Sequence, residues 1–109
     1  MKKRAILYEL ISNDDENLSS VYFKFDDGYF IICRNLVEDD TIYFEMNDQS
    51  NCIYSNDCKY IIEKDHLILN FSEIISNKLK CETTLQIDYE MLEQERKLLQ
   101  DCLEEIFSL

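Results

Sequence analysis

The sequence predicts an α+β fold: an antiparallel β-sheet with a short helix and a C-terminal amphipathic helix packed on one face. Short runs rich in Tyr, Phe, Ile and Val are separated by clusters of Asn, Asp and Ser, a pattern typical of strands joined by tight turns. Apolar residues with helical spacing occur late in the chain, in two segments. Strands that come first and a long helix that comes last favour α+β over an alternating α/β order.

The clearest element is a hairpin of two strands at residues 21–25 and 29–36. The sequence between them, "DDG", contains Asp27-Gly28, the favoured pair for a tight primed turn. Gly28 is the only glycine of the chain, and we expect it to have a positive φ angle there. The same kind of apolar run predicts further strands at residues 5–11, 41–46, 58–64, 66–71 and 84–89.

The remaining turns are expected at Asn, Asp and Ser clusters, because the chain has no proline. Asn and Asp side chains bond to their own backbone and tolerate a left-handed φ. These clusters lie at residues 12–17, 25–28, 47–51 and 55–57. Lys64-Asp65 is expected to form a short reversal between two strands.

The first predicted helix covers residues 72–80. Ser72 is a suitable N-cap, and Ile75 and Leu79 lie four residues apart, on one helical face.

The C-terminal segment from Asp88 onward predicts a longer amphipathic helix. Asp88 is the expected cap, and Glu90 and Glu93 suit the positive N-terminal end of the helix dipole. The apolar stripe consists of Leu92, Leu99, Leu103 and Ile106, widened by Met91, Leu98, Cys102 and Phe107. The stripe is expected to pack on the sheet, with charged residues on the opposite face.

A chain of 109 residues with 46% apolar content is expected to fold as one domain, residues 1–109. The longest apolar runs, such as residues 29–33, are far too short to cross a bilayer. The basic start is followed by an apolar stretch that Glu9 and Asp14 interrupt, without a small-residue cleavage site, so no signal peptide is expected.

The cysteines indicate reduced, mostly buried thiols in a cytoplasmic protein. They number five, an odd count, and no two have C-x-x-C spacing. This argues against a disulfide framework.

The acidic residues are concentrated in two blocks of a chain whose net charge is −12. Residues 38–57 carry six acids and no base, and residues 81–109 carry eight acids and two bases. Such a chain repels nucleic acid and anionic membranes and attracts basic proteins. The alternative is that the acids serve only solubility.

No catalytic motif or cofactor-binding motif is present, and no cofactor is expected. His66 is the only histidine, and a Cys–His nucleophile pair would require the fold to bring Cys58 or Cys81 beside it. A zinc site is disfavoured because Cys52 and Cys58 have no second ligand pair. Calcium is a stronger rival, because the acidic loops supply oxygen ligands, yet the twelve-residue loop with its glycine and closing Glu is missing.

Residues 40–56, "DTIYFEMNDQSNCIYSN", resemble a pattern in the immunity protein ten family of bacterial polymorphic-toxin systems. The matching positions are Asp40, Tyr43, Glu45 and Tyr54. The order that follows is similar too: strand, short helix, strand and terminal helix, so that the resemblance covers roughly residues 20–109. It implies a cytoplasmic protein without enzymatic activity that binds and blocks a toxin.

The leading hypothesis is therefore an immunity protein that neutralises a cognate toxin domain by steric and electrostatic occlusion. Acids would steer a basic partner, and tyrosines would anchor it. The expected partner-binding residues are Glu38, Asp39, Asp40, Tyr43, Glu45, Asp48, Tyr54 and Asp57. Tyr43 and Glu45 share one face of their strand, opposite Ile42, Phe44 and Met46, and either a structural or a binding role fits them. Rival hypotheses are an acidic metal-binding regulatory module and a general interaction domain; the oligomeric state is left open.

Overall fold

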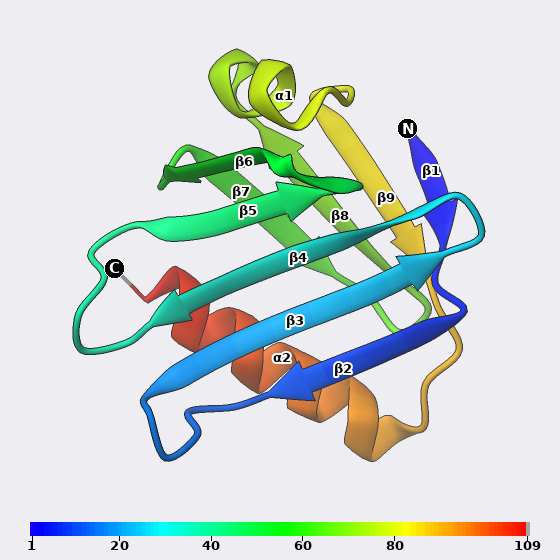
Figure 1. Ribbon diagram of the computed structural model, residues 1–109. Coiled ribbons are helices and arrows are strands. Elements are labelled where there is room, and N and C mark those ends of the chain that lie inside the picture. The colour runs from blue at the N-terminus through cyan, green and yellow to red at the C-terminus, as the bar shows by residue number, and fades with distance from the viewer. Residues whose placement is uncertain (109) are drawn as a thin grey trace.

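The nine strands in residues 1–108, the part of the chain that this computed structural model describes, form two sheets (Figure 1). The first is a five-stranded antiparallel meander in the order β2-β3-β4-β5-β6. Its strands are β2 (Leu7–Ile11), β3 (Leu18–Phe25), β4 (Gly28–Asn35), β5 (Ile42–Met46) and β6 (Asp48–Ser55). The second sheet has the order β1-β9-β8-β7 and contains β1 (Lys2–Arg4), β7 (Cys58–Ile62), β8 (His66–Phe71) and β9 (Thr84–Asp88). The predicted α+β class is confirmed, with two sheets in place of one.

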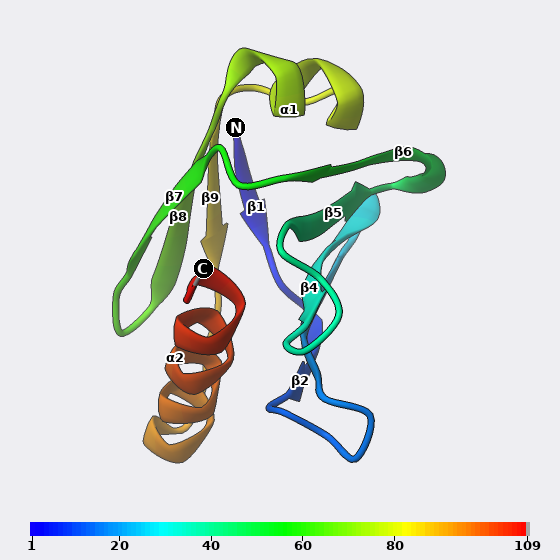
Figure 2. The ribbon, with the colours of Figure 1, turned by 90° about the vertical axis from the view of Figure 1, so that its left-hand side faces the viewer.

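Both helices lie on the same side of the five-stranded sheet. The short helix α1 (Glu73–Leu79) contacts β5, β6 and β8, and the long helix α2 (Glu93–Phe107) contacts β2, β3 and β4. Figure 2 shows the four-stranded sheet and α2 on one side of the core and the five-stranded sheet on the other, with α1 at one end. No helix or strand of residues 1–108 lies over the opposite side of the five-stranded sheet (Figures 1 and 2).

Alternation along the strands fills the core. In β3, residues Val21, Phe23 and Phe25 are buried, and their neighbours point outward. The same period applies in β5, where Ile42, Phe44 and Met46 face the core as expected. Aromatic contacts join the two layers: the Phe71 ring of β8 lies 6.1 Å from Phe30 and 5.9 Å from Phe44, between ring centroids.

The predicted strand at residues 5–11 is observed as β2, and the separate strand β1, which was not predicted, precedes it in the other sheet. β1 pairs in parallel with β9, and β2 pairs antiparallel with β3. The chain crosses between the sheets at Ala5, whose N–H bonds to the Asp88 carbonyl, and Ile6, whose N–H bonds to the Lys24 carbonyl. Each backbone group of this crossing thus finds a partner in the sheet it adjoins.

β6 is the strand that the sequence pattern missed. Residues 47–51 and 55–57 were expected to be turns, yet residues 48–55 pair with β5 beyond an irregularity at Glu45/Met46. Polar residues at the edge of a sheet need no apolar row, so their sequence looks like a loop. The clusters at 12–17 and 47–51 do supply the left-handed turn residues Asn13, Asn17 and Asn47, as expected.

The prediction for Gly28 was wrong in its reason. Gly28 does not have a positive φ, and neither do Asp26 and Asp27, so the β3–β4 turn is not of a primed type. Glycine is required there by a close approach: a Cβ atom would lie 1.9 Å from Oδ1 of Asn47. That same Oδ1 accepts a hydrogen bond from the Tyr29 N–H, at 3.0 Å.

The α1 helix follows its prediction, since Ser72 caps it by accepting the Ile75 N–H, and Ile75 and Leu79 are buried. The α2 helix begins later than expected, at Glu93, and Asp88 does not cap it but ends β9. Residue 89 explains the delay. The buried Tyr89 ring stacks on Phe23, and its hydroxyl donates to the carbonyls of Glu63 and His66, so the extended chain continues past Asp88.

The apolar stripe of α2 was only partly predicted correctly. Leu99, Cys102, Leu103 and Ile106 are buried, and Met91 and Phe107 are half-buried. Leu92 and Leu98 were expected in the stripe but are exposed. Leu92 lies just before the first helical turn, where the helical period does not yet apply.

A buried arginine fastens the end of α2 to the sheet. Arg34 of β4 is 6% exposed and points into the core. Its Nε donates to the Ile106 carbonyl at 3.0 Å, and its Nη2 donates to the Glu105 carbonyl at 2.7 Å. Nη1 reaches the Asp39 carbonyl in the β4–β5 loop at 3.1 Å. Because the last turn of α2 has no basic residue of its own, Arg34 supplies the positive charge that a helix C-terminus favours.

We expect Arg34→Met to lower the free energy of unfolding by about 2–4 kcal/mol, because one buried and two partly buried carbonyls lose their donor. Urea denaturation monitored by circular dichroism measures this. Arg4→Met is the control: Arg4 forms an exposed pair with Glu90, and its loss should change stability by less than about 0.5 kcal/mol. Equal effects of the two substitutions would contradict the assignment.

Candidate functional site

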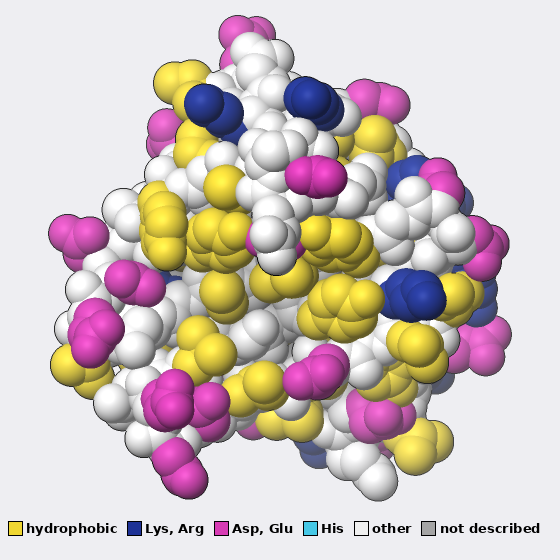
Figure 3. Space-filling view, viewed as in Figure 1, with side chains coloured by type: hydrophobic (Ala, Val, Ile, Leu, Met, Phe, Trp, Pro, Cys, Tyr) yellow, Lys and Arg dark blue, Asp and Glu magenta, His cyan; other side chains and the backbone are white. Residues whose placement is uncertain are grey.

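The candidate site is the uncovered side of the five-stranded sheet, which we call the outer sheet face. Strand register assigns its residues, because directly paired residues point the same way. The face consists of Leu7, Glu9, Ile11, Ser20, Tyr22, Lys24, Tyr29, Ile31, Cys33, Tyr43, Glu45, Cys52 and Tyr54. Figure 3 looks onto this face and shows a band of hydrophobic side chains across its centre, with acidic groups around the rim.

The apolar band is unusual for a sheet surface that no other layer covers. Leu7 is 60% exposed and Tyr54 59% exposed, and the band continues through half-buried Tyr22, Ile31 and Cys33. Contiguous apolar surface of this kind marks interaction sites in soluble proteins. The sequence carried a signal for it: "YFIIC" is apolar at consecutive positions, as in strands buried on both faces, although the fold covers only one.

Glu45 lies at the centre of the outer sheet face and is only 8% exposed. The Tyr43 hydroxyl donates to its Oε1 at 2.5 Å, and the Tyr29 hydroxyl donates to its Oε2 at 2.6 Å. None of the ion pairs within residues 1–108 includes Glu45. The carboxylate is therefore held by two phenols and has no cationic partner in the described part of the chain.

Tyrosine rings surround this carboxylate. Tyr54 of β6 pairs with Tyr43 across the strands, with ring centroids 5.1 Å apart. Tyr22 and Tyr29 lie 6.1 Å apart on the neighbouring strands. The structure thus brings together the sequence-predicted residues Tyr43, Glu45 and Tyr54, and adds Tyr22 and Tyr29, which the sequence analysis did not single out.

The hydrogen bonds to Glu45 favour the protonated phenols. The bond to Glu45 is the largest cause that raises the pKa of Tyr29 to about 12, and burial adds to it. Burial first, and then the bond to Glu45, raises the pKa of Tyr43. Burial also raises the pKa of the Cys33 thiol to about 11. At neutral pH these groups are uncharged, and Glu45 is the only acid at the centre of the face.

The acids at the rim belong to two loops that the sequence treated separately. Glu38, Asp39 and Asp40 lie in the β4–β5 loop, and Asp14, Asp15 and Glu16 lie in the β2–β3 loop. The loops touch: the Leu36 N–H donates to the Asn17 carbonyl, and the Asn35 side chain donates to the Glu16 carbonyl. We call these six acids the acidic edge. It borders one end of the outer sheet face (Figure 3).

Two of the predicted acids are separated from each other. Asp48 lies at the β5–β6 hairpin, at the end of β5 away from the acidic edge, where its carboxylate accepts from the Ser50 N–H and hydroxyl. β6 then returns the chain to the opposite end of the sheet, where Asp57 lies. The neighbouring Asn56 side chain donates to the Asp40 carbonyl there. The acid-only stretch 38–57 is therefore not one surface in space.

The side chains of the acidic edge differ in their freedom. Asp39 accepts from the Asn35 N–H, and Asp14 accepts from the backbone of Glu16 and Leu18, so these two hold their loops in shape. Nothing within residues 1–108 hydrogen-bonds to the carboxylates of Glu38 or Asp40. These two are available to a partner.

The rival sites receive no geometric support. Within residues 1–108 no three His, Cys, Asp or Glu side chains lie close enough together to hold a metal ion. Cys58 pairs with Phe71 at one end of β8, and His66 begins the other end, so the two are about 16 Å apart at 3.3 Å per residue. Cys81 also lies at the Phe71 end, next to α1.

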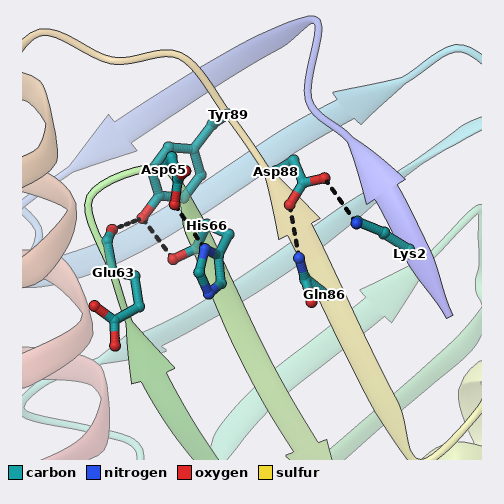
Figure 4. A network of polar contacts seen from close by, with 7 residues as sticks. All are labelled: Lys2, Glu63, Asp65, His66, Gln86, Asp88 and Tyr89. Carbon is teal, nitrogen blue, oxygen red and sulfur yellow. Dashed lines mark hydrogen bonds and ion pairs between the residues drawn. The ribbon is translucent and has the colours of Figure 1, made fainter.

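His66 instead belongs to a polar network on the four-stranded sheet (Figure 4). Its Nδ1 lies 2.7 Å from the Asp65 carboxylate, and Tyr89 binds the backbone of the same turn. The bond to His66 lowers the pKa of Asp65. Neighbouring Asp88 contacts Gln86 and Lys2 beside an open hollow of about 380 Å³. The contacts of this network hold the β7–β8 turn in place and pair charges at the surface.

No known family model, curated protein or solved structure matches this chain. The resemblance to the immunity protein ten family therefore stays a prediction from residues 40–56.

None of the helices among residues 1–108 has the length and apolar content that spanning a membrane requires.

We expect Glu45→Gln to lower the pKa of Tyr29 from about 12 toward the ordinary value of 10.0, because the acceptor loses its charge. The folded-state value lies above the unfolded one, so the stabilising contribution is present below pH 10 and is lost as the pH rises through about 12. NMR titration of labelled tyrosines measures the change. Tyr60 is the internal control, because burial and Glu104 raise its pKa and Glu45 does not. An unchanged Tyr29 would contradict the assignment.

Proposed function

We propose that this chain is a cytoplasmic immunity-type protein that binds a basic toxin domain and neutralises it by steric and electrostatic occlusion. The observation that carries the proposal is the position of Tyr43, Glu45 and Tyr54. These residues carry the family resemblance, and they lie side by side on a sheet face that the fold leaves uncovered.

The distribution of charge supports a basic partner. The apolar band is bordered by the acidic edge, and the whole chain carries −12. Complementary charge accelerates the encounter, and aromatic side chains in a desolvated centre supply lasting affinity. An inhibitor of this kind needs no catalytic group of its own, because occlusion of the toxin is sufficient.

A general interaction domain is the second candidate. The same apolar face would meet a second copy of this chain, or a partner that is not a toxin. Self-association predicts that the molar mass in solution rises with protein concentration. An inhibitor that binds only its toxin predicts a monomer mass at every concentration.

Co-expression tests the proposed function. The toxin domain encoded beside this gene is expressed in a host with and without the chain. We expect growth to be restored and a complex to appear on a sizing column. If growth is not restored and no complex forms, the proposal is wrong. A chain with Ile32→Asp, which disrupts the core, serves as the unfolded control.

We expect the triple variant Glu16→Gln, Glu38→Gln, Asp40→Asn to slow association with that toxin domain by roughly 3–10-fold at low salt, and to flatten the salt dependence. The dissociation rate should hardly change, because these side chains lie at the rim. Surface plasmon resonance at several salt concentrations separates the two rates.

The matched control removes the same charge away from the outer sheet face: Glu63→Gln, Glu73→Gln, Asp101→Asn. These residues lie at the β7–β8 turn, on α1 and on α2. If both triple variants slow association equally, net charge alone explains the rate, and the acidic edge has no special part.

A further inference from the structure

We propose that Glu45, with the rings of Tyr29, Tyr43 and Tyr54, forms a receptor for an arginine side chain of the partner. The inference rests on the proposed function, since it names the group by which a basic partner is anchored. The receptor lies at the centre of the outer sheet face and would hold the bound partner, whereas the acidic edge would affect only the rate at which the partner associates.

The first observation is the state of Glu45. A carboxylate that is 8% exposed is ordinarily paired with a cation, because removing a charge from water is costly. Glu45 has two phenol donors and no cation within residues 1–108. Lys24 is the only basic residue assigned to this face. It lies opposite Tyr29, with its Cα about 12 Å from that of Glu45 by strand spacing, and none of the ion pairs within residues 1–108 joins the two side chains.

The second observation is the orientation of the remaining acceptors. Each Glu45 oxygen accepts one phenol, and a carboxylate oxygen accepts two hydrogen bonds. One site on each oxygen is therefore left for an incoming donor. Because the two phenols hold the carboxylate from both sides, its two oxygens are fixed as a pair. A guanidinium group offers two parallel N–H donors that match such a pair.

The third observation is the aromatic wall. Tyr54 is 59% exposed, and its ring leans on Tyr43 beside Glu45. A planar cation that binds Glu45 would lie against these rings and gain cation–π attraction. Arginine is favoured over lysine, because its guanidinium stacks on rings and gives up hydration more readily than an ammonium group does.

A purely structural role for Glu45 makes a different prediction. If Glu45 served only to join the two phenols, a glutamine would do the same through its carbonyl and amide, and binding would not change. The charge itself is required only if a cation arrives. Glu45→Gln therefore separates the two roles.

The probes are three neutral-flanked peptides of the form acetyl-Gly-Ser-X-Ser-Gly-amide, in which X is arginine, lysine or citrulline. Citrulline keeps the shape of arginine without its charge. Each is titrated into the labelled full chain, and amide and tyrosine shifts are followed by NMR. We expect the arginine peptide to bind with a Kd on the order of 1 mM, and to shift residues of β4, β5 and β6 on the outer sheet face.

We expect the lysine peptide to bind at least about 3-fold more weakly, and the citrulline peptide not to bind. Glu45→Gln and Tyr54→Ala should each weaken the arginine peptide by about 5-fold or more. The matched control Glu63→Gln removes a charge from the β7–β8 turn and should bind like the parent chain. Thermal unfolding tests whether each variant retains the fold. If Glu45→Gln unfolds, Tyr54→Ala, at an exposed edge position, still tests the receptor.

Two results would overturn the receptor: equal binding of the arginine and lysine peptides with shifts at the acidic edge, or full binding by Glu45→Gln. The co-expression test is independent of both. If the toxin is neutralised equally well by Glu45→Gln, the proposed function stands and the receptor falls. If arginine binds at Glu45 and no toxin is neutralised, the receptor stands and the proposed function falls.

Discussion

The placement of α2 on the inner side of the five-stranded sheet is the constraint on which the rest depends. Arg34 binds the carbonyls at its C-terminal end, and the Glu105 side chain accepts the hydroxyls of Ser12 and Ser19. Ser19 is fully buried, so this polar attachment lies within the core rather than at its surface. Because α2 is fixed there and α1 packs on β5 and β6, neither helix of the described residues covers the opposite side. The outer sheet face is uncovered because both helices of the described residues pack on the other side of the sheet.

Local features of the fold were readable from the sequence, and long-range ones were not. Strand alternation at Ile42, Phe44 and Met46 and the Ser72 cap depend on neighbours in the chain. The division into two sheets depends on backbone bonds from Ala5 and Ile6 to strands far along the chain. The late start of α2 has the same origin, because Tyr89 is held in place by the β7–β8 turn.

The candidate site shows the same division. A period of two placed Tyr43 and Glu45 on one face, and the structure keeps them together. Tyr29 reaches Glu45 only through the pairing of β4 with β5, which the sequence does not specify. Charge counted along the chain was a weaker guide, since residues 38–57 fold back on themselves at Asn47 and send Asp48 away from Asp40. The acidic edge that results includes residues 14–16, which belonged to no block in the sequence.

The cost of Glu45 argues for a use beyond the fold. A hydrophobic residue at this position would continue the apolar row of Tyr22 and Ile31 without any desolvation penalty. Two phenols offset part of that penalty, and they do so by pointing their hydroxyls at the carboxylate rather than toward water. In the proposed receptor, this arrangement orients the charge before the arginine of the partner arrives, which would lower the entropy lost on binding. Such a receptor would also disfavour partners that lack a cation at the matching position, because the Glu45 charge would then be covered with only its two phenol donors as compensation.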